Sequence, residues 1–171
     1  RIKMTLQVYK VTPDVVAKNG MNVMIYGKQG VGKTHLAAPA QDHALMRPVL
    51  FLDIEGGMMT VAGRGDITAV SIKTVDDMQE ITSKLLSGND AEFKQYRTVV
   101  IDNISEWQRI DLEKITADLG AKRRPDEVQL QDYNVSTNRI GRLIRTYRDM
   151  PMNVIVTAWE KEQKEGGEDG K

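Results

Sequence analysis

The chain has 171 residues, of which 40% are hydrophobic and 28% charged, a balance that suits one globular domain and argues against an intrinsically disordered chain. It contains no cysteine, which excludes disulfides and thiolate metal sites, and no apolar run reaches the roughly 18 residues needed to span a membrane. Lys plus Arg number 24 and Asp plus Glu number 24, so the net charge gives no argument for a dedicated nucleic-acid binder. From the absence of cysteine and of a membrane-spanning run we expect a cytoplasmic protein without membrane contact.

The first half of the chain predicts strands and helices in alternation. In order, they are a strand at residues 22–26, a helix at 33–46, a strand at 49–52, a strand at 67–72 and a helix at 74–86. The first strand is a short apolar run without alternation and is expected to be buried. Pro39 is expected to kink or interrupt the first helix. The second helix has a capping-box-like start at Thr74 and Asp77 and a glycine stop at Gly88.

The second half continues the pattern. In order, it predicts a strand at residues 98–102, a helix at 104–119, a helix at 131–149 and a strand at 153–157. Short apolar strands separated by helices predict the α/β class, with three layers and a mostly parallel sheet covered on both faces. Ligands of such sheets bind at the carboxyl ends of the strands, where this sequence places Gly27 onward, Asp53, Glu55, Asp102 and residues 157–160.

The most informative motif is Gly-Lys-Gln-Gly-Val-Gly-Lys-Thr at residues 27–34, which matches the phosphate-binding pattern G-x-x-x-x-G-K-[ST] in full. Glycines in this pattern let successive backbone N–H groups point at phosphate oxygens, while the lysine reaches the β- and γ-phosphates and the hydroxyl binds Mg²⁺. The motif follows an apolar strand and opens a helix, which is the context that it requires. We therefore predict a nucleotide site in which Lys33 is also a catalytic group. Its predicted binding residues are Gly27, Lys28, Gln29, Gly30, Val31, Gly32, Lys33, Thr34 and His35.

A phosphate-binding loop of this kind needs a second anchor for its metal ion, and Asp102 supplies a candidate at the end of an apolar strand. We predict that Thr34 and Asp102 hold Mg²⁺. Hydrolysis also needs a group that orients or deprotonates water. Asn103 follows Asp102 directly, and its amide cannot act as a base. Glu55, which we expect beside the loop because it follows the second strand, is the predicted base.

In order and spacing these elements resemble the RecA-like recombinase ATPase core, over most of residues 22–165. The resemblance rests on the phosphate loop, on Asp-x-Glu at residues 53–55 and on the strands at 98–102 and 153–158. The stretches Gly-Lys-Thr, Val-Val-Ile-Asp-Asn and Val-Ile-Val-Thr-Ala-Trp-Glu most closely resemble phage nucleotide-binding proteins of this class, some of which are single-strand-annealing or recombination proteins. The resemblance implies one RecA-like P-loop NTPase domain over residues 1–171, a Mg²⁺-dependent ATPase that uses ATP, and a homo-oligomeric ring or filament.

The same resemblance makes Glu55 the catalytic glutamate and places residues 157–160 where the family has a polar γ-phosphate sensor. That sensor is usually a Gln, and here Thr157 or Glu160 would take its place. Glu160 is also the second candidate for the base. The alternative is that Asp53 and Glu55 are solvated loop residues, which would favour a scaffold that binds ATP without turnover.

Recombinases bind DNA through two loops, which would correspond here to residues 120–131 and to 161–171 onward. The first loop holds the predicted DNA contacts Lys122, Arg123 and Arg124, from which we expect single-stranded DNA as a partner. A cluster of three basic residues is equally compatible with a solvated loop. A stripe of arginines on the last helix would meet phosphate or a neighbouring subunit, or would simply be exposed. It consists of Arg139, Arg142, Arg145 and Arg148.

Two other classes share the phosphate loop. A nucleotide or small-molecule kinase usually has an arginine-rich lid, and the sequence has no clear one. An AAA-type remodelling ATPase usually has an acid directly after the second anchor, so Asn103 argues against that class. The sequence has no Asn-Lys-x-Asp guanine motif, which favours ATP. The chain opens at Arg1 and closes in a polar, glycine-rich run, so we expect incomplete termini and a mobile loop at residues 160–171.

Overall fold

The computed structural model describes residues 10, 12, 20–120 and 127–160. Its elements, in chain order, are β1 (Asn22–Gly27), α2 (Lys33–Ala37), the 3-10 helix η1 (Ala38–Asp42), β2 (Val49–Asp53), the 3-10 helix η2 (Gly57–Val61), β3 (Thr68–Ser71), α3 (Val75–Ser87), β4 (Thr98–Asp102), α4 (Ile104–Asp118), α5 (Leu130–Arg148) and β5 (Asn153–Trp159). The strands form one sheet in the order β1-β5-β4-β2-β3, and every neighbouring pair is parallel. None of the described helices is both long and apolar enough to cross a membrane.

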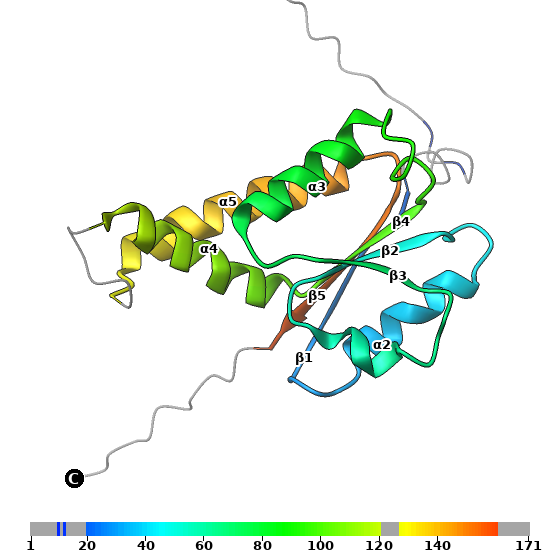
Figure 1. The fold of residues 1–171 in the computed structure, drawn as a ribbon, viewed down its shortest axis with the longest axis horizontal. Coiled ribbons are helices and arrows are strands. Elements are labelled where there is room, and N and C mark those ends of the chain that lie inside the picture. Colours follow the sequence, from blue (N-terminus) through cyan, green and yellow to red (C-terminus); the bar gives the residue numbers. More distant parts are fainter. Residues whose placement is uncertain (1–9, 11, 13–19, 121–126, 161–171) are drawn as a thin grey trace, which may run out of the picture.

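The sheet lies between two layers of helices (Figure 1). On one face, α3, α4 and α5 pack over a core that includes Leu50, Leu52 and Ile101. On the other face, α2 and the two 3-10 helices pack over a core that includes Val49 and Phe51. Alternate residues of β2 therefore enter different cores, because successive side chains of a strand point to opposite faces. The predicted α/β class, with three layers and a parallel sheet, is confirmed.

The burial of β1 is predicted wrongly from the sequence. β1 lies at an edge of the sheet, beside β5, and its side chains alternate between exposed and half-buried. Val23 and Ile25 pack on the core that α2 covers, whereas Met24 and Tyr26 are 56% and 72% exposed. A short apolar run does not reveal whether its strand is central or at an edge, because that depends on the order of strands in the folded sheet.

The helix predicted at residues 33–46 is much shorter in the structure. α2 ends at Ala37, and the chain continues as η1 with Pro39 in its first turn. Proline has no N–H to donate to the carbonyl four residues earlier, and its ring clashes there, so α-helical hydrogen bonding stops. The tighter turns of η1 leave the small side chains Ala38 and Ala40 buried in the core on this face of the sheet.

The ends of α3 follow their local sequence signals. The backbone N–H of Asp77 donates to Thr74 Oγ1 at 3.1 Å, and the Asp77 carboxylate accepts from the N–H of Thr74 at 2.8 Å. Gly88, with φ of +59°, terminates the helix in the left-handed conformation. The predicted capping box and glycine stop are both confirmed.

Candidate nucleotide-binding site

The carboxyl ends of the parallel strands carry a cavity of about 790 Å³. Its walls come from the P-loop (residues 27–34) with the start of α2, from the loop after β2, and from the ends of β4 and β5. The structure thus brings Lys33, Thr34, Glu55 and Asp102 into one cavity. In the sheet, β5 and β4 lie between β1 and β2. Glu55, in the loop after β2, nevertheless meets the P-loop as expected, because Gln29 Nε2 donates to its carboxylate at 3.0 Å.

The P-loop folds back over its own lysine. The loop turns through Gly30 and Gly32, whose φ angles of +78° and +91° are open to glycine without strain. Lys33 is 8% exposed, and its Nζ donates to the carbonyl oxygens of Gly27 at 3.0 Å and Lys28 at 2.8 Å. A buried ammonium needs acceptors, and the loop supplies two of them. The ammonium therefore lies against the same loop that the motif assigns to the phosphates.

Asp102 lies between two threonine hydroxyls and is 3% exposed. Thr34 Oγ1 donates to Asp102 Oδ2 at 2.6 Å, and Thr157 Oγ1 donates to Oδ1. Because Thr34 donates its proton, its oxygen keeps lone pairs for a cation, as does the carboxylate. In nucleotide sites Mg²⁺ uses one or two protein oxygens together with phosphates and water, which this pair fits. Within the described ranges no group of three or more His, Cys, Asp or Glu gathers, so the residues do not form an all-protein cage.

The loop after β2 is fixed to the end of β4. Asp53 Oδ1 accepts from the N–H groups of Gly56 at 2.8 Å and Gly57 at 3.0 Å, which curls the loop. The N–H of Ile54 donates to the carbonyl oxygen of Asp102 at 2.8 Å. Asp53 is therefore a turn-forming residue. The same curl carries Glu55 to the cavity wall, where it is exposed, so the interpretation as a solvated loop carboxylate is excluded for Asp53 but not for Glu55.

The carboxylate of Glu55 links two other segments of the site. Gln29 Nε2, from the P-loop, donates to Glu55 Oε1 at 3.0 Å. Asn103 Nδ2 donates to the other oxygen, Oε2. Asn103 is fully buried, and its Oδ1 accepts from the N–H of Glu106 at 2.8 Å, which caps α4. The sequence did not reveal this contact with Glu55, although an asparagine three residues before a glutamate is a signal for the start of a helix.

The two expected γ-phosphate sensors do not line the cavity. Thr157 is fully buried against Asp102, and Glu160 is exposed, with its N–H donating to the carbonyl of Gly27 at 3.1 Å. Trp159, to which the sequence gave no separate role, does line the cavity. Its indole nitrogen is buried and has no hydrogen-bond partner among the described residues.

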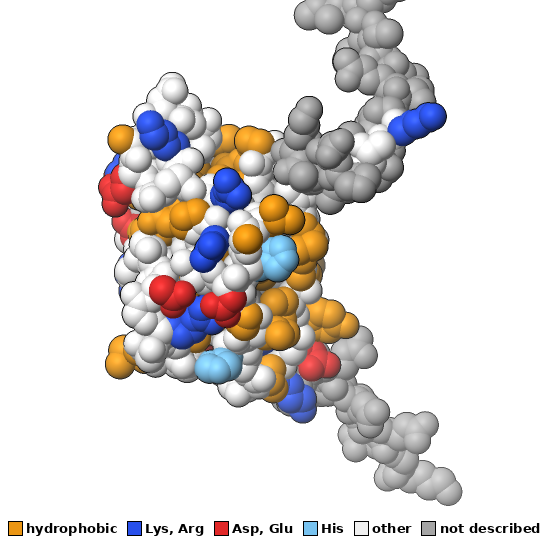
Figure 2. All heavy atoms as spheres, turned by 90° about the vertical axis from the view of Figure 1, so that its right-hand side faces the viewer, with side chains coloured by type: hydrophobic (Ala, Val, Ile, Leu, Met, Phe, Trp, Pro, Cys, Tyr) orange, Lys and Arg blue, Asp and Glu red, His pale blue; other side chains and the backbone are white. Residues whose placement is uncertain are grey.

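Of the other predicted residues, Gly27 and Lys28 give their carbonyl oxygens to Lys33 but do not line the cavity, and the rest line the cavity or lie outside the described residues. Figure 2 shows the side of the molecule on which α2 lies in Figure 1, where hydrophobic side chains are exposed among charged ones. Val31 is 62% exposed and lines the cavity together with the exposed His35. The predicted DNA contacts Lys122, Arg123 and Arg124, and the second loop at residues 161–171, lie outside the described residues.

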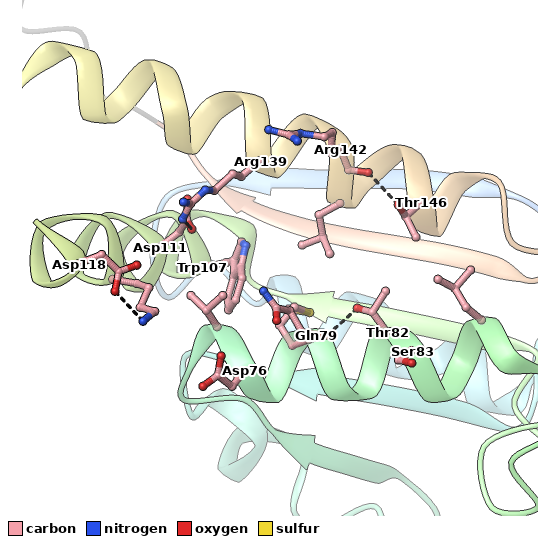
Figure 3. A pocket seen from close by; sticks show the side chains of 15 residues that line it. Asp76, Gln79, Thr82, Ser83, Trp107, Asp111, Asp118, Arg139, Arg142 and Thr146 are labelled. Carbon is pink, nitrogen blue, oxygen red and sulfur yellow. Dashed lines mark hydrogen bonds and ion pairs between the residues drawn. The ribbon is translucent and has the colours of Figure 1, made fainter.

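A second hollow, of about 760 Å³, lies between α3 on one side and α4 and α5 on the other (Figure 3). Part of the predicted arginine stripe faces it. Arg139 donates to the buried Asp111 at 3.0 Å, whereas Arg148 bonds its exposed neighbour Asp149. The arginines therefore do not form one uniform surface for phosphate, because at least two of them already bind carboxylates.

Two of the comparisons with known proteins find a match. A family model described as an AAA domain matches residues 19–171. None of the curated proteins matches the chain. A solved structure of a KaiC-like protein from the hyperthermophilic archaeon Pyrococcus horikoshii is 17% identical over 82% of this chain, with a TM-score of 0.49, and the match spans 63% of that protein's chain. The expectation that Asn103 argues against an AAA-type ATPase is wrong, since the AAA model matches a sequence that has this residue.

Proposed function

The chain belongs to the AAA domain family, and from this premise we propose that it binds ATP with Mg²⁺ and hydrolyses it, with Glu55 as the general base. The observation that carries the proposal is the meeting of Lys33, Thr34, Asp102 and Glu55 in one cavity. Together they supply what phosphoryl transfer requires: a cation for the phosphates, oxygen ligands for the metal, and a carboxylate to receive the proton of water.

Each residue has a distinct task in the proposed site. Lys33 exchanges the carbonyls of its own loop for phosphate oxygens, which are charged and therefore stronger acceptors. Thr34 and Asp102 hold Mg²⁺, which neutralises phosphate charge when bound. Glu55 accepts one N–H bond at each carboxylate oxygen, so each oxygen keeps a lone pair for a water proton.

The test is Glu55→Gln, which keeps the shape of the side chain and removes the base. We expect ATP to bind with unchanged affinity while single-turnover hydrolysis falls by roughly 10²- to 10⁴-fold. Glu160→Gln is the matched control, because Glu160 is the other carboxylate predicted for this role but lies outside the cavity wall. Loss of hydrolysis in Glu160→Gln and not in Glu55→Gln would move the base to Glu160.

We further propose that this ATPase acts on single-stranded DNA, as part of a homo-oligomer in recombination or annealing. The support is the resemblance to recombinases and the basic cluster Lys122, Arg123 and Arg124, which comes after α4 in the sequence. Fluorescence anisotropy with and without ATP and Mg²⁺ should show nucleotide-dependent binding whose salt dependence weakens when the cluster is neutralised. An unchanged salt dependence would return these residues to the solvated-loop interpretation.

A further inference from the structure

We propose that Asn103 is the positioning residue of Glu55: its buried side-chain amide holds the carboxylate at the cavity wall. This inference rests on the proposed function, because it assigns a partner to the proposed base. Asn103 itself takes no part in proton transfer, since its amide neither accepts nor releases a proton. Its effect on hydrolysis runs through the orientation of Glu55.

The direction of the hydrogen bond between Asn103 and Glu55 is set by the helix that Asn103 caps. The N–H of Glu106 can only donate, so the side-chain atom of Asn103 that meets it must be the oxygen. The remaining atom, Nδ2, then faces Glu55 Oε2 as a donor. A flipped amide would leave two donors together at the helix start and two acceptors together at Glu55. Both contacts therefore fix the same orientation.

The two partners of Glu55 differ in how firmly they are held. Gln29 is exposed and belongs to the P-loop, the segment assigned to the phosphates. Asn103 is fully buried and follows the central strand β4 directly. A buried amide that makes two hydrogen bonds has few alternative rotamers, so Asn103 holds the Glu55 carboxylate in one position.

Capping alone does not account for asparagine at this position. Serine, threonine and aspartate cap helices about as well as asparagine. Of these four, asparagine is the residue that can accept from the helix with its oxygen and still donate an N–H elsewhere. This difference allows the two roles to be separated by substitution.

Two variants keep the cap and remove the donor. Asn103→Ser should retain the bond to Glu106 but no longer reach Glu55, and Asn103→Asp should place a second carboxylate against it. We expect kcat for ATP hydrolysis to fall roughly 10- to 100-fold in both, as for a misplaced reacting group. In Asn103→Ser, KM, ATP affinity and Tm should stay close to those of the native chain, whereas the buried second carboxylate of Asn103→Asp should also lower Tm. Thr74→Ala is the control for a damaged helix start, because it removes the cap of α3, a helix that does not line the cavity. This variant should lower Tm without changing kcat.

A double variant separates failure of this inference from failure of the proposed function. If Asn103 acts through Glu55, adding Asn103→Ser to Glu55→Gln should cause no further loss in single-turnover hydrolysis. If the losses of the two single variants multiply in the double variant, or if both Asn103 variants keep a native kcat, the positioning role is overturned while Glu55 stays the base. A native rate in Glu55→Gln itself would instead overturn the proposed function on which the inference rests.

Discussion

The two hollows of this molecule are almost equal in size, about 790 Å³ at the strand ends and about 760 Å³ between the helices, but their polar groups are arranged differently. Between the helices, charges are paired at short range: Lys114 bonds Asp118 one turn away on α4, and Arg139 bonds Asp111 on the adjacent helix. At the strand ends, the bonded pair Thr34 and Asp102 is 68 residues apart in sequence.

Size therefore does not separate the candidate nucleotide site from the hollow between the helices, and the arrangement of polar groups does. In the hollow between the helices, one ion pair lies within α4 and the other joins α5 to α4, so both are contacts of the fold. At the strand ends, donors and acceptors from four segments converge and keep bonding capacity for a ligand. One cation from each region, Lys33 and Arg139, should therefore give opposite results when it is removed.

Lys33→Ala should have the largest effect on binding. The loss of a charge-assisted donor to phosphate, worth about 1.5–3 kcal/mol, predicts a fall in ATP affinity on the order of 100-fold, while the fold stays intact. Isothermal titration with ATP and Mg²⁺ measures the first quantity and thermal unfolding the second. Lys84→Ala removes a partly exposed lysine of α3, which does not line the cavity, as the control. Unchanged affinity in Lys33→Ala would place the nucleotide elsewhere.

Arg139→Met should lower the stability of the fold and leave ATP binding unchanged. It leaves the carboxylate of Asp111, which is 2% exposed, without its charged partner. Because Arg139 itself is partly exposed, we expect the free energy of unfolding to fall by about 1–3 kcal/mol, below the cost of breaking a fully buried pair. ATP affinity and hydrolysis should not change. Adding Asp111→Asn should restore part of the stability, and a loss of ATP binding would show that the groove and the cavity are coupled.

Thr157→Val should have a smaller effect, confined to the strand-end site. It removes the hydroxyl that holds Asp102 Oδ1 with little change in side-chain shape. We expect the apparent affinity for Mg²⁺ in ATP hydrolysis to fall roughly tenfold, in line with about 1–1.5 kcal/mol for one hydrogen bond. Thr116→Val is the matched control, since Thr116 is also buried but bonds carbonyls of its own helix. Equal effects in the two variants would argue against a role for Thr157 at the metal.

The parts of the fold that the sequence predicts best depend on neighbouring residues. The cap of α3 needs only Thr74 and Asp77, and a proline beyond the first turn of a helix, such as Pro39, interrupts α-helical bonding. The exposure of Met24 and Tyr26 could not be predicted in this way. It follows from the place of β1 at the edge, which is decided by how distant strands pair.

The same distinction holds in the candidate site. Lys33 and Thr34 belong to a local motif, and Asp102 and Glu55 could be predicted because each follows an apolar strand. The hydrogen-bond partners of these residues could not be predicted. Nothing local to Asn103 indicates that it faces Glu55, because that contact depends on a loop from β2 crossing to the end of β4.

Tyr147→Phe should have the smallest effect at neutral pH and tests the core beside the groove. Tyr147 is fully buried, and its hydroxyl contacts Thr82 Oγ1 at 3.0 Å, so the variant should lose about 0.5–1.5 kcal/mol of stability. Burial raises the pKa of Tyr147 from 10.0 to about 12, with the bond to Thr82 opposing the shift.

The raised pKa predicts how this small difference changes in alkali. Above pH 10 the unfolded chain releases the tyrosine proton while the folded chain keeps it, so this group's contribution falls by about 1.4 kcal/mol per pH unit until the folded pKa near 12 is reached. Phenylalanine does not titrate, so the stability difference between the native chain and Tyr147→Phe should shrink and then reverse as the pH rises through this window. Urea unfolding from pH 7 to 11 measures it, with Tyr133→Phe, which removes an exposed hydroxyl of the same helix, as the control. A difference that stays constant with pH would mean that the hydroxyl of Tyr147 reaches water in the folded protein.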